Sequence, residues 1–185
     1  YKMKNTGRTF NLMTKYYLSV DIGASSGRHI LSHVENGKLV LEEVYRFENG
    51  MEDKNGSLIW DYKKLFANVL EGMKECKKIG KIPVSVGIDT WGVDYALIDA
   101  DGEVIGDVYA YRDGRTDEPI KKLHKKIPFE TLYERTGSQF QIYNTIYQLY
   151  TDKLSGKLEK AERFLMMPDF FNYLLTGVMK NEFTN

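Results

Sequence analysis

A glycine- and serine-rich loop directly after a short apolar strand constrains the fold of this chain more than any other feature. The loop covers residues 21–28, Asp-Ile-Gly-Ala-Ser-Ser-Gly-Arg, and the strand before it carries Tyr17, Leu18 and Val20. Glycines allow backbone N–H groups to approach an anion, the serines add hydroxyl donors, and Arg28 adds a permanent positive charge. The segment therefore predicts a phosphate-binding loop, since an ordinary hairpin turn needs fewer such residues.

The residues after the loop decide which kind of phosphate loop is expected. Residues 29–34 alternate in polarity, residues 35–38 form a turn, and residues 39–47 again have the pattern of a strand. Dinucleotide-binding and P-loop motifs require a helix at this point. The loop therefore joins two strands, which favours the phosphate hairpin of the actin and hexokinase type of ATPase.

A helix follows the third predicted strand. Residues 48–57 are rich in Asn, Gly and charged residues and predict a loop, after which Asp61 can cap a helix that Gly80 and Pro83 end. The apolar residues at helical spacing are Leu65, Phe66, Val69, Leu70 and Met73. The apolar run 84–88 then predicts a parallel strand that is buried on both faces.

Two strands and several helices complete the predicted domain. Residues 93–99 and 103–111 have strand patterns and are separated by Asp101-Gly102, a hairpin signal. The predicted helices are 118–126, 129–136, 144–154 and 170–175, the last of which Gly177 ends. This order predicts an α/β domain of the ribonuclease-H-like type, with a mixed sheet flanked by helices.

Composition excludes several classes of protein. The 185 residues carry a formal net charge of zero, so no overall field attracts nucleic acid or membranes. A single cysteine, Cys76, excludes an internal disulfide and a Cys-based zinc site, and it favours a reducing cytoplasm. No segment approaches the roughly 20 apolar residues of a membrane span. Residues 1–15 are polar and irregular, so we expect a flexible extension before one domain over 16–185.

A second polar segment follows the strand 84–88. Residues 87–95 read Gly-Ile-Asp-Thr-Trp-Gly-Val-Asp-Tyr, and ligands of open α/β sheets bind at such strand ends. Trp91 offers a flat face to a sugar, and Asp89 or Asp94 could bind hydroxyl groups. Gly92 lets a ligand reach the backbone, and we expect little room for a side chain there. The alternative is structural, because Asp and Gly also form turns and Trp is often a core residue.

A third polar segment, residues 109–116, contains two arginines. Arg112 and Arg115 could bind phosphate, or they could pair with Asp113 and Asp117. The ion pairs are the favoured interpretation, because oppositely charged residues adjoin each arginine in the sequence.

The three histidines indicate no catalytic or metal site. His29, His33 and His124 lack the spacing of metal ligands, and none has a Ser or Cys placed to form a triad. We expect all three on the solvated surface.

Six sequence strings occur in an order that resembles the FGGY carbohydrate kinase family, and within it the rhamnulokinase branch. They are DIGASSGR, GSLIWD, GIDTWGVDYALID, YAYRDGRT, TGSQFQIYNTIYQL and MPDFFNYLLTG. The likeness covers about residues 16–185. It implies transfer of the γ-phosphoryl group of ATP to the 1-hydroxyl of L-rhamnulose, with Mg²⁺ as cofactor.

The resemblance also assigns roles to individual residues. Gly92 matches the glycine that contacts the sugar, and Trp91 lies beside it. Asp21 lies where the wider superfamily keeps a carboxylate near magnesium, although capping of its own loop is a rival role. The residues that match the ATP-binding loop are Ala24, Ser25, Ser26, Gly27 and Arg28.

The resemblance implies that the catalytic base lies outside this sequence. Family members have two domains, and their catalytic Asp lies in a His-Asp-Thr stretch that this sequence lacks. We therefore expect an N-terminal part without turnover of its own, since phosphoryl transfer depends on positioning from both sides of a cleft. The alternatives are another FGGY ketose kinase, an actin- or chaperone-like ATPase module, and a non-catalytic regulator with the same fold.

Overall fold

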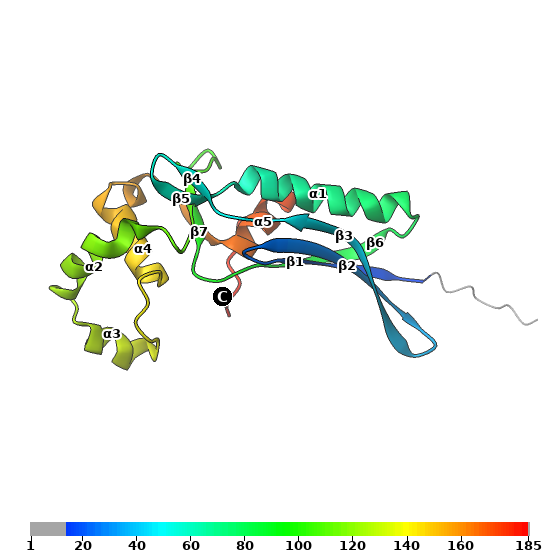
Figure 1. Cartoon of the computed structure of the whole chain (residues 1–185), viewed down its shortest axis with the longest axis horizontal. Coiled ribbons are helices and arrows are strands. Elements are labelled where there is room, and N and C mark those ends of the chain that lie inside the picture. Colours follow the sequence, from blue (N-terminus) through cyan, green and yellow to red (C-terminus); the bar gives the residue numbers. More distant parts are fainter. Residues whose placement is uncertain (1–13, 185) are drawn as a thin grey trace, which may run out of the picture.

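A mixed β-sheet forms the centre of the computed structural model, which describes residues 14–184 (Figure 1). Strands β1 (Tyr16–Ile22), β2 (Ser26–Glu35) and β3 (Lys38–Glu48) form an antiparallel meander, and β6 (Pro83–Asp89) pairs with β1 in parallel. The order β3-β2-β1-β6 confirms the predicted mixed sheet, and the glycine loop does join two strands. Most of the predicted N-terminal extension, residues 1–13, lies outside the described residues.

Helix α1 (Tyr62–Lys78) crosses from the meander to β6 and covers one face of the sheet (Figure 1). Its start is as predicted, because the Asp61 carboxylate accepts a hydrogen bond from the Lys64 N–H at 3.0 Å. Gly80 follows the helix with a φ of +72°, a left-handed conformation that glycine adopts without strain. Both predicted ends of this helix are confirmed.

The prediction that residues 84–88 are buried on both faces is wrong. Val84 is 60% exposed, and β6 pairs only with β1 among the strands of residues 14–184. An apolar run does not distinguish an edge strand from a central one, because its pattern reports hydrophobicity and not the number of neighbouring strands.

The predicted loop over residues 48–57 contains a hairpin. Strands β4 (Glu52–Lys54) and β5 (Ser57–Trp60) pair antiparallel around Asn55 and Gly56, whose φ angles are 56° and 82°. Positive φ at both central residues is typical of the Asn-Gly turn, which matches the twist of a hairpin. Strand β4 is too short and polar to show a strand pattern.

The two strands predicted around Asp101-Gly102 form with different partners. Strand β7 (Tyr95–Ile98) makes one bridge across the turn, from Ile98 to Val104, and otherwise pairs with β9 (Arg163–Met166). Strand β8 (Val108–Tyr109) pairs with β5 instead. The predicted hairpin is therefore limited to its turn.

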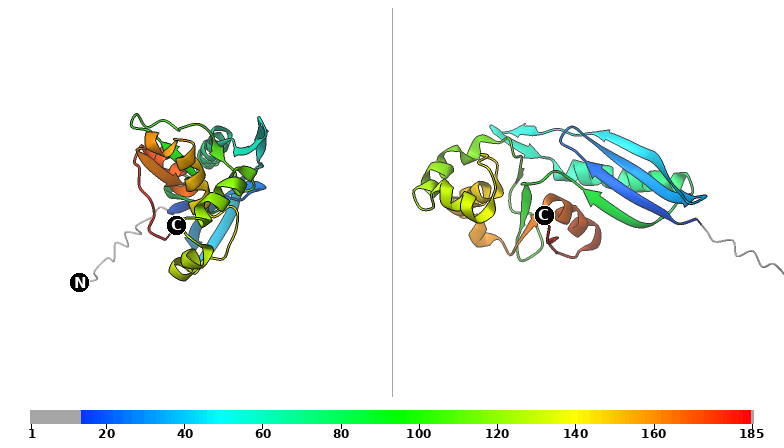
Figure 2. Two further views of the ribbon diagram at one scale, coloured as in Figure 1. Left: turned by 90° about the vertical axis from the view of Figure 1, so that its left-hand side faces the viewer. Right: turned by 90° about the horizontal axis from the view of Figure 1, so that it is seen from below.

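The helices of the second half lie at the positions predicted. They are α2 (Asp117–His124), α3 (Phe129–Thr136), α4 (Thr145–Leu154) and α5 (Met167–Thr176), with short 3₁₀ turns η1 (Gly114–Thr116) and η2 (Leu158–Lys160). Helices α2 to α4 gather at one end of the molecule, away from the meander (Figures 1 and 2). Gly177 ends α5 with a φ of 71°, as predicted. Of the helices within residues 14–184, none has the length and hydropathy to cross a bilayer.

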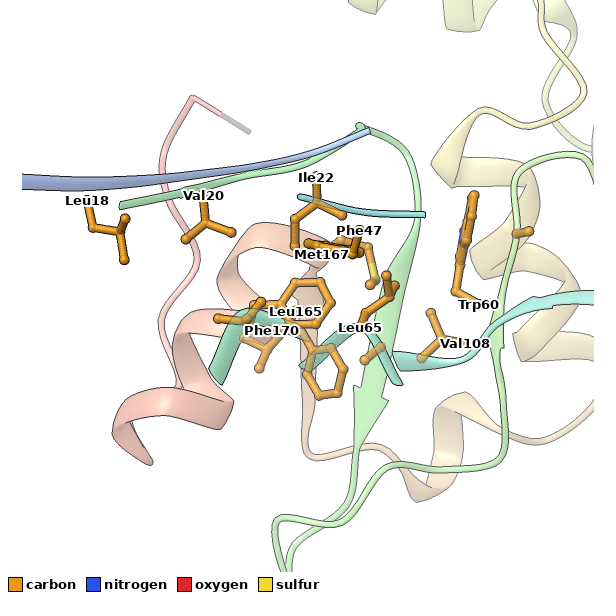
Figure 3. Packing of buried hydrophobic residues seen from close by; sticks show 14 of the residues in the cluster. Leu18, Val20, Ile22, Phe47, Trp60, Leu65, Val108, Leu165, Met167 and Phe170 are labelled. Atoms are coloured by element: carbon orange, nitrogen blue, oxygen red, sulfur yellow. The ribbon is translucent and has the colours of Figure 1, made fainter. Parts of the chain in front are cut away.

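The core lies between the sheet, α1 and α5. Leu18, Val20 and Ile22 alternate along β1 and point together toward the buried side chains of Leu65 and Phe170, which come from the two helices (Figure 3). This alternation is the period of a strand with one buried face. It leaves the end of β1, at Asp21, at the border between core and solvent.

The prediction of a solvated His29 is wrong. Its ring is fully buried between β2 and α1, where a Cβ on Gly72 would lie only 2.3 Å from the ring. Nε2 lies 3.1 Å from the Val69 carbonyl oxygen, whereas Nδ1 has no hydrogen-bond partner in residues 14–184. Burial lowers the pKa of His29. Sequence spacing could not show this contact, because Gly72 belongs to a distant helix.

Candidate functional site

The predicted phosphate loop is a tight connection between β1 and β2. Its turn closes through a hydrogen bond from the Gly23 N–H to the Ser26 carbonyl at 2.9 Å. Asn49, just after β3, supports it from the side: the side-chain amide donates to the Gly23 carbonyl at 2.8 Å and the backbone N–H donates to the Ser25 carbonyl at 3.0 Å. Sequence reasoning missed Asn49, because only the pairing of β2 with β3 brings it to the loop.

The loop carbonyls of Gly23, Ser25 and Ser26 accept hydrogen bonds, whereas several donors of the loop remain available. Within residues 14–184, the N–H groups of Ala24 and Ser25 and the hydroxyls of Ser25 and Ser26 have no acceptor. Ser25 is exposed, and Ala24 and Ser26 are half-buried. A turn that presents free N–H and O–H groups has the chemistry of an anion-binding concavity.

Gly27 has a structural explanation. It lies in β2 opposite Phe47, and a Cβ at this position would lie 2.1 Å from the Phe47 Cζ atom. Only glycine leaves space for the ring, which is itself part of the core. The role of Gly27 at ATP stays a prediction.

Arg28 and Asp21 face each other across β1 and β2. The Arg28 Nη2 lies 2.8 Å from the Asp21 Oδ2, and the side chains are 49% and 45% exposed. Such half-exposed pairs contribute about 0–1 kcal/mol to stability, so the pair can separate at little cost when a ligand arrives. The charge of Arg28 therefore stays available at the loop.

A magnesium ion fits the end of β1 if phosphates and water supply most of its ligands. Asp21 is the Cα partner of Asp89 on β6, so two carboxylates lie on neighbouring strand ends. The Asp21 Oδ1 accepts no hydrogen bond from residues 14–184, and that part of the chain holds no cluster of three or more His, Cys, Asp or Glu side chains. Mg²⁺ commonly binds proteins through one or two carboxylates and keeps several waters.

A surface hollow of about 290 Å³ lies at the same end of β6. Asp89, Thr90, Asp169 and Asn172 contribute to its lining, which suits a ligand rich in hydroxyl groups. A larger hollow of about 460 Å³ lies between the β4–β5 hairpin and the start of α1. It contains none of the predicted site residues.

One face of the Trp91 ring packs inside the protein. Its ring centroid lies 4.1 Å from that of Trp60, and its Nε1 donates a hydrogen bond to the Asp94 Oδ2 at 2.9 Å. The half-buried ring therefore belongs to the core on one side. Stacking of a sugar on Trp91 stays a prediction for its other side.

Asp94 is a fully buried carboxylate whose oxygens are all engaged by the protein. Oδ2 accepts hydrogen bonds from the Trp60 Nε1 at 2.7 Å, the Trp91 Nε1 at 2.9 Å and the Tyr111 N–H at 3.0 Å, and Oδ1 accepts one from the Gln148 Nε2 at 3.0 Å. Burial raises the pKa of Asp94, and these donors oppose the rise. Asp94 thus holds the loop and does not offer a free oxygen to a hydroxyl group.

Gly92 is exposed on a strained turn. A Cβ there would meet nothing within 4 Å, which corrects the expectation of little room, and its φ lies outside the left-handed region. Val93 instead has a φ of 69°, and the Asp94 N–H donates to the Gly92 carbonyl at 2.9 Å. This is a γ-turn of the rare left-handed kind, which costs a β-branched residue about 1–3 kcal/mol.

The predicted ion pairs of Arg115 with Asp113 and Asp117 are wrong, because Arg115 pairs with Asp152 instead. Its Nη1 lies 2.6 Å from the Asp152 Oδ1, and its Nη2 donates to the Gln148 Oε1 at 3.1 Å. The side chain is largely buried and lies over the Tyr109 ring. Arg115 therefore connects α4 to strand β8 and is not free for phosphate.

Comparison with known proteins agrees with this architecture. The model of the N-terminal domain of the FGGY family of carbohydrate kinases matches residues 16–185. Rhamnulokinases of Halalkalibacterium halodurans and Oceanobacillus iheyensis are 48% and 47% identical to this chain over 92% and 94% of its length. The chain spans 37% of the length of each of these relatives.

Solved structures show the same fold. A gluconate kinase from Lactobacillus acidophilus matches 90% of this chain and 34% of its own with a TM-score of 0.74 at 19% identity. A xylulose kinase from Rhodospirillum rubrum matches 91% of this chain and 36% of its own, also with a TM-score of 0.74, at 18% identity. The chain belongs to the FGGY family of carbohydrate kinases.

Proposed function

We propose that this chain is the N-terminal, ligand-binding part of a kinase that transfers the γ-phosphoryl group of ATP to the 1-hydroxyl of L-rhamnulose. One observation carries the proposal: a loop with free N–H and O–H donors and the exposed Gly92 turn follow two neighbouring parallel strands, β1 and β6. Open α/β sheets bind ligands at this edge. The similarity to rhamnulokinases supports rhamnulose, rather than another ketose, as the proposed sugar.

The residues divide into two groups in this proposal. Ala24 to Arg28 contact the phosphates, and Asp21 contributes to the magnesium site. Gly92 offers its backbone to the sugar, with Trp91 beside it. The ion, when bound, neutralises charge on the phosphates, while the loop donors orient them.

The general base that accepts the proton of the sugar hydroxyl comes from a further part of the protein in this proposal. Asp94 cannot serve, because its oxygens are occupied inside the fold. We therefore expect the 185-residue chain alone to release no ADP above a control without enzyme. ADP release by this chain alone would show that our assignment of the general base to a further part of the protein is wrong.

A substrate panel on the complete kinase tests the proposal. ADP release is measured with ATP and, in turn, L-rhamnulose, D-xylulose, D-gluconate and glycerol. The expected result is a kcat/KM for L-rhamnulose well above the other values. A higher kcat/KM for another substrate would mean that rhamnulose is not the substrate. ATP hydrolysis that needs no sugar would favour the chaperone-like alternative.

A further inference from the structure

We propose that Thr145 is a positioning residue for the sugar site, because its hydroxyl holds the strained turn that presents Gly92. The Thr145 Oγ1 donates a hydrogen bond to the Val93 carbonyl oxygen at 3.0 Å. In this proposal Thr145 acts through the turn and is not assigned a contact with the sugar. The inference rests on the proposed role of Gly92 at the sugar, and it adds a residue of α4 to that site.

The turn needs external support because Val93 is in an unfavourable conformation. Its φ of 69° lies in the left-handed region, which β-branched residues rarely occupy. A return of Val93 to negative φ would rotate the peptide between Gly92 and Val93 and break the hydrogen bond from the Asp94 N–H to the Gly92 carbonyl. The direction of the Gly92 backbone therefore depends on what holds Val93.

Two groups of contacts hold the turn. On its C-terminal side, the buried carboxylate of Asp94 is bound by both tryptophans. In the peptide that joins Val93 to Asp94, the Val93 carbonyl accepts hydrogen bonds from Thr145 and from the Gln148 Nε2 at 3.3 Å. The turn is thus fixed between β5 and α4.

Thr145 is the more specific of the two donors to the carbonyl. The Gln148 amide nitrogen also lies 3.0 Å from both the Asp94 Oδ1 and the Tyr143 carbonyl, so its two hydrogens are shared among three acceptors. The hydroxyl of Thr145 has one hydrogen and directs it to Val93. Loss of this hydroxyl should loosen the turn without leaving a buried charge unpaired.

The test is a pair of substitutions in the complete kinase, of which the first is nearly isosteric and the second keeps the hydroxyl. Thr145→Val removes the donor and should raise the KM for L-rhamnulose about threefold to tenfold, the range for one neutral hydrogen bond. The KM for ATP should stay at the wild-type value, and the melting temperature should fall only by what the loss of one neutral hydrogen bond allows. Thr145→Ser keeps the hydroxyl and should restore the KM for the sugar.

Thr151→Val is the matched control on the same helix. The Thr151 hydroxyl donates to the Tyr147 carbonyl at 2.9 Å, within α4 and away from the turn. This variant should leave both Michaelis constants unchanged. An equal rise in the KM for the sugar in both valine variants would reveal a general effect on α4 and overturn the proposal.

Hydrogen exchange of the Asp94 amide supplies a readout that does not depend on activity. Thr145→Val should speed its exchange severalfold, whereas Thr151→Val should not. Unchanged exchange in Thr145→Val would overturn the inference, whatever the sugar. If exchange rises but wild-type kinase does not phosphorylate L-rhamnulose, the proposed function fails while the support of the turn by Thr145 stands.

Discussion

Replacement of Gly27 by Ala tests whether this glycine serves packing. The new Cβ would lie 2.1 Å, 2.4 Å and 2.7 Å from three atoms of the Phe47 ring. The nearest atom must retreat by about 1.4 Å to reach a normal carbon–carbon contact. Phe47 is only 8% exposed and lies in the main core cluster, so its ring has little space to move.

The magnitude follows from two opposing effects. Overpacking of a core costs about 1–3 kcal/mol, whereas replacement of glycine inside a strand gains about 0.5–1 kcal/mol in backbone entropy. Because three atoms of a buried ring lie inside contact distance, the overpacking cost should be in the upper part of its range, about 2–3 kcal/mol. We therefore expect Gly27→Ala to lower the free energy of unfolding by about 1–2.5 kcal/mol. For a domain of this size, that corresponds to a melting temperature about 2–10 °C lower.

Urea unfolding, followed by tryptophan fluorescence, measures the effect in a double-mutant cycle with Phe47→Leu. The smaller side chain removes the clash, so Gly27→Ala should cost about 1 kcal/mol less in that background. Gly50→Ala is the matched control, because a Cβ there meets nothing within 4 Å and no positive φ is required. Additive effects, or a Gly27→Ala variant as stable as Gly50→Ala, would refute the packing explanation.

Two further predictions concern buried polar groups. Asp94→Asn should lower the free energy of unfolding by about 1–3 kcal/mol, because one amide oxygen cannot accept all the donors that now surround the carboxylate; an unchanged urea midpoint would contradict this. Burial lowers the pKa of folded His29 below 6.5, so the unfolded chain binds more protons and stability falls as the pH drops below this value. Urea midpoints between pH 7 and 5 should show that His29→Leu loses part of this slope, and an equal slope in both proteins would contradict the assignment.

Local signals in the sequence were sufficient to predict much of the fold. The glycine loop between two strand patterns, the cap at Asp61 and the stop at Gly177 each act within a few residues, so the sequence determines them directly. The same holds for the turn at Asp101-Gly102, which forms even though its second strand pairs elsewhere.

Features that depend on distant partners could not be predicted. Burial of His29 depends on the space above Gly72, and the engagement of Asp94 depends on Gln148, 54 positions later. Asn49 reaches the phosphate loop only through strand pairing. The left-handed Val93 has no sequence signal, because valine is among the residues that least favour that conformation.

The most direct test of the account is whether the two loops bind different ligands. Michaelis constants for ATP and L-rhamnulose are measured in the complete kinase with Arg28→Ala and Gly92→Val. Loss of a charge-assisted contact should raise the KM for ATP about tenfold to a hundredfold in Arg28→Ala and leave that for the sugar unchanged. Gly92→Val should raise the KM for L-rhamnulose alone, at an unchanged melting temperature, because Gly92 is exposed and a Cβ there meets nothing within 4 Å beyond its chain neighbours. Variants that change both constants equally, or neither, would contradict the account.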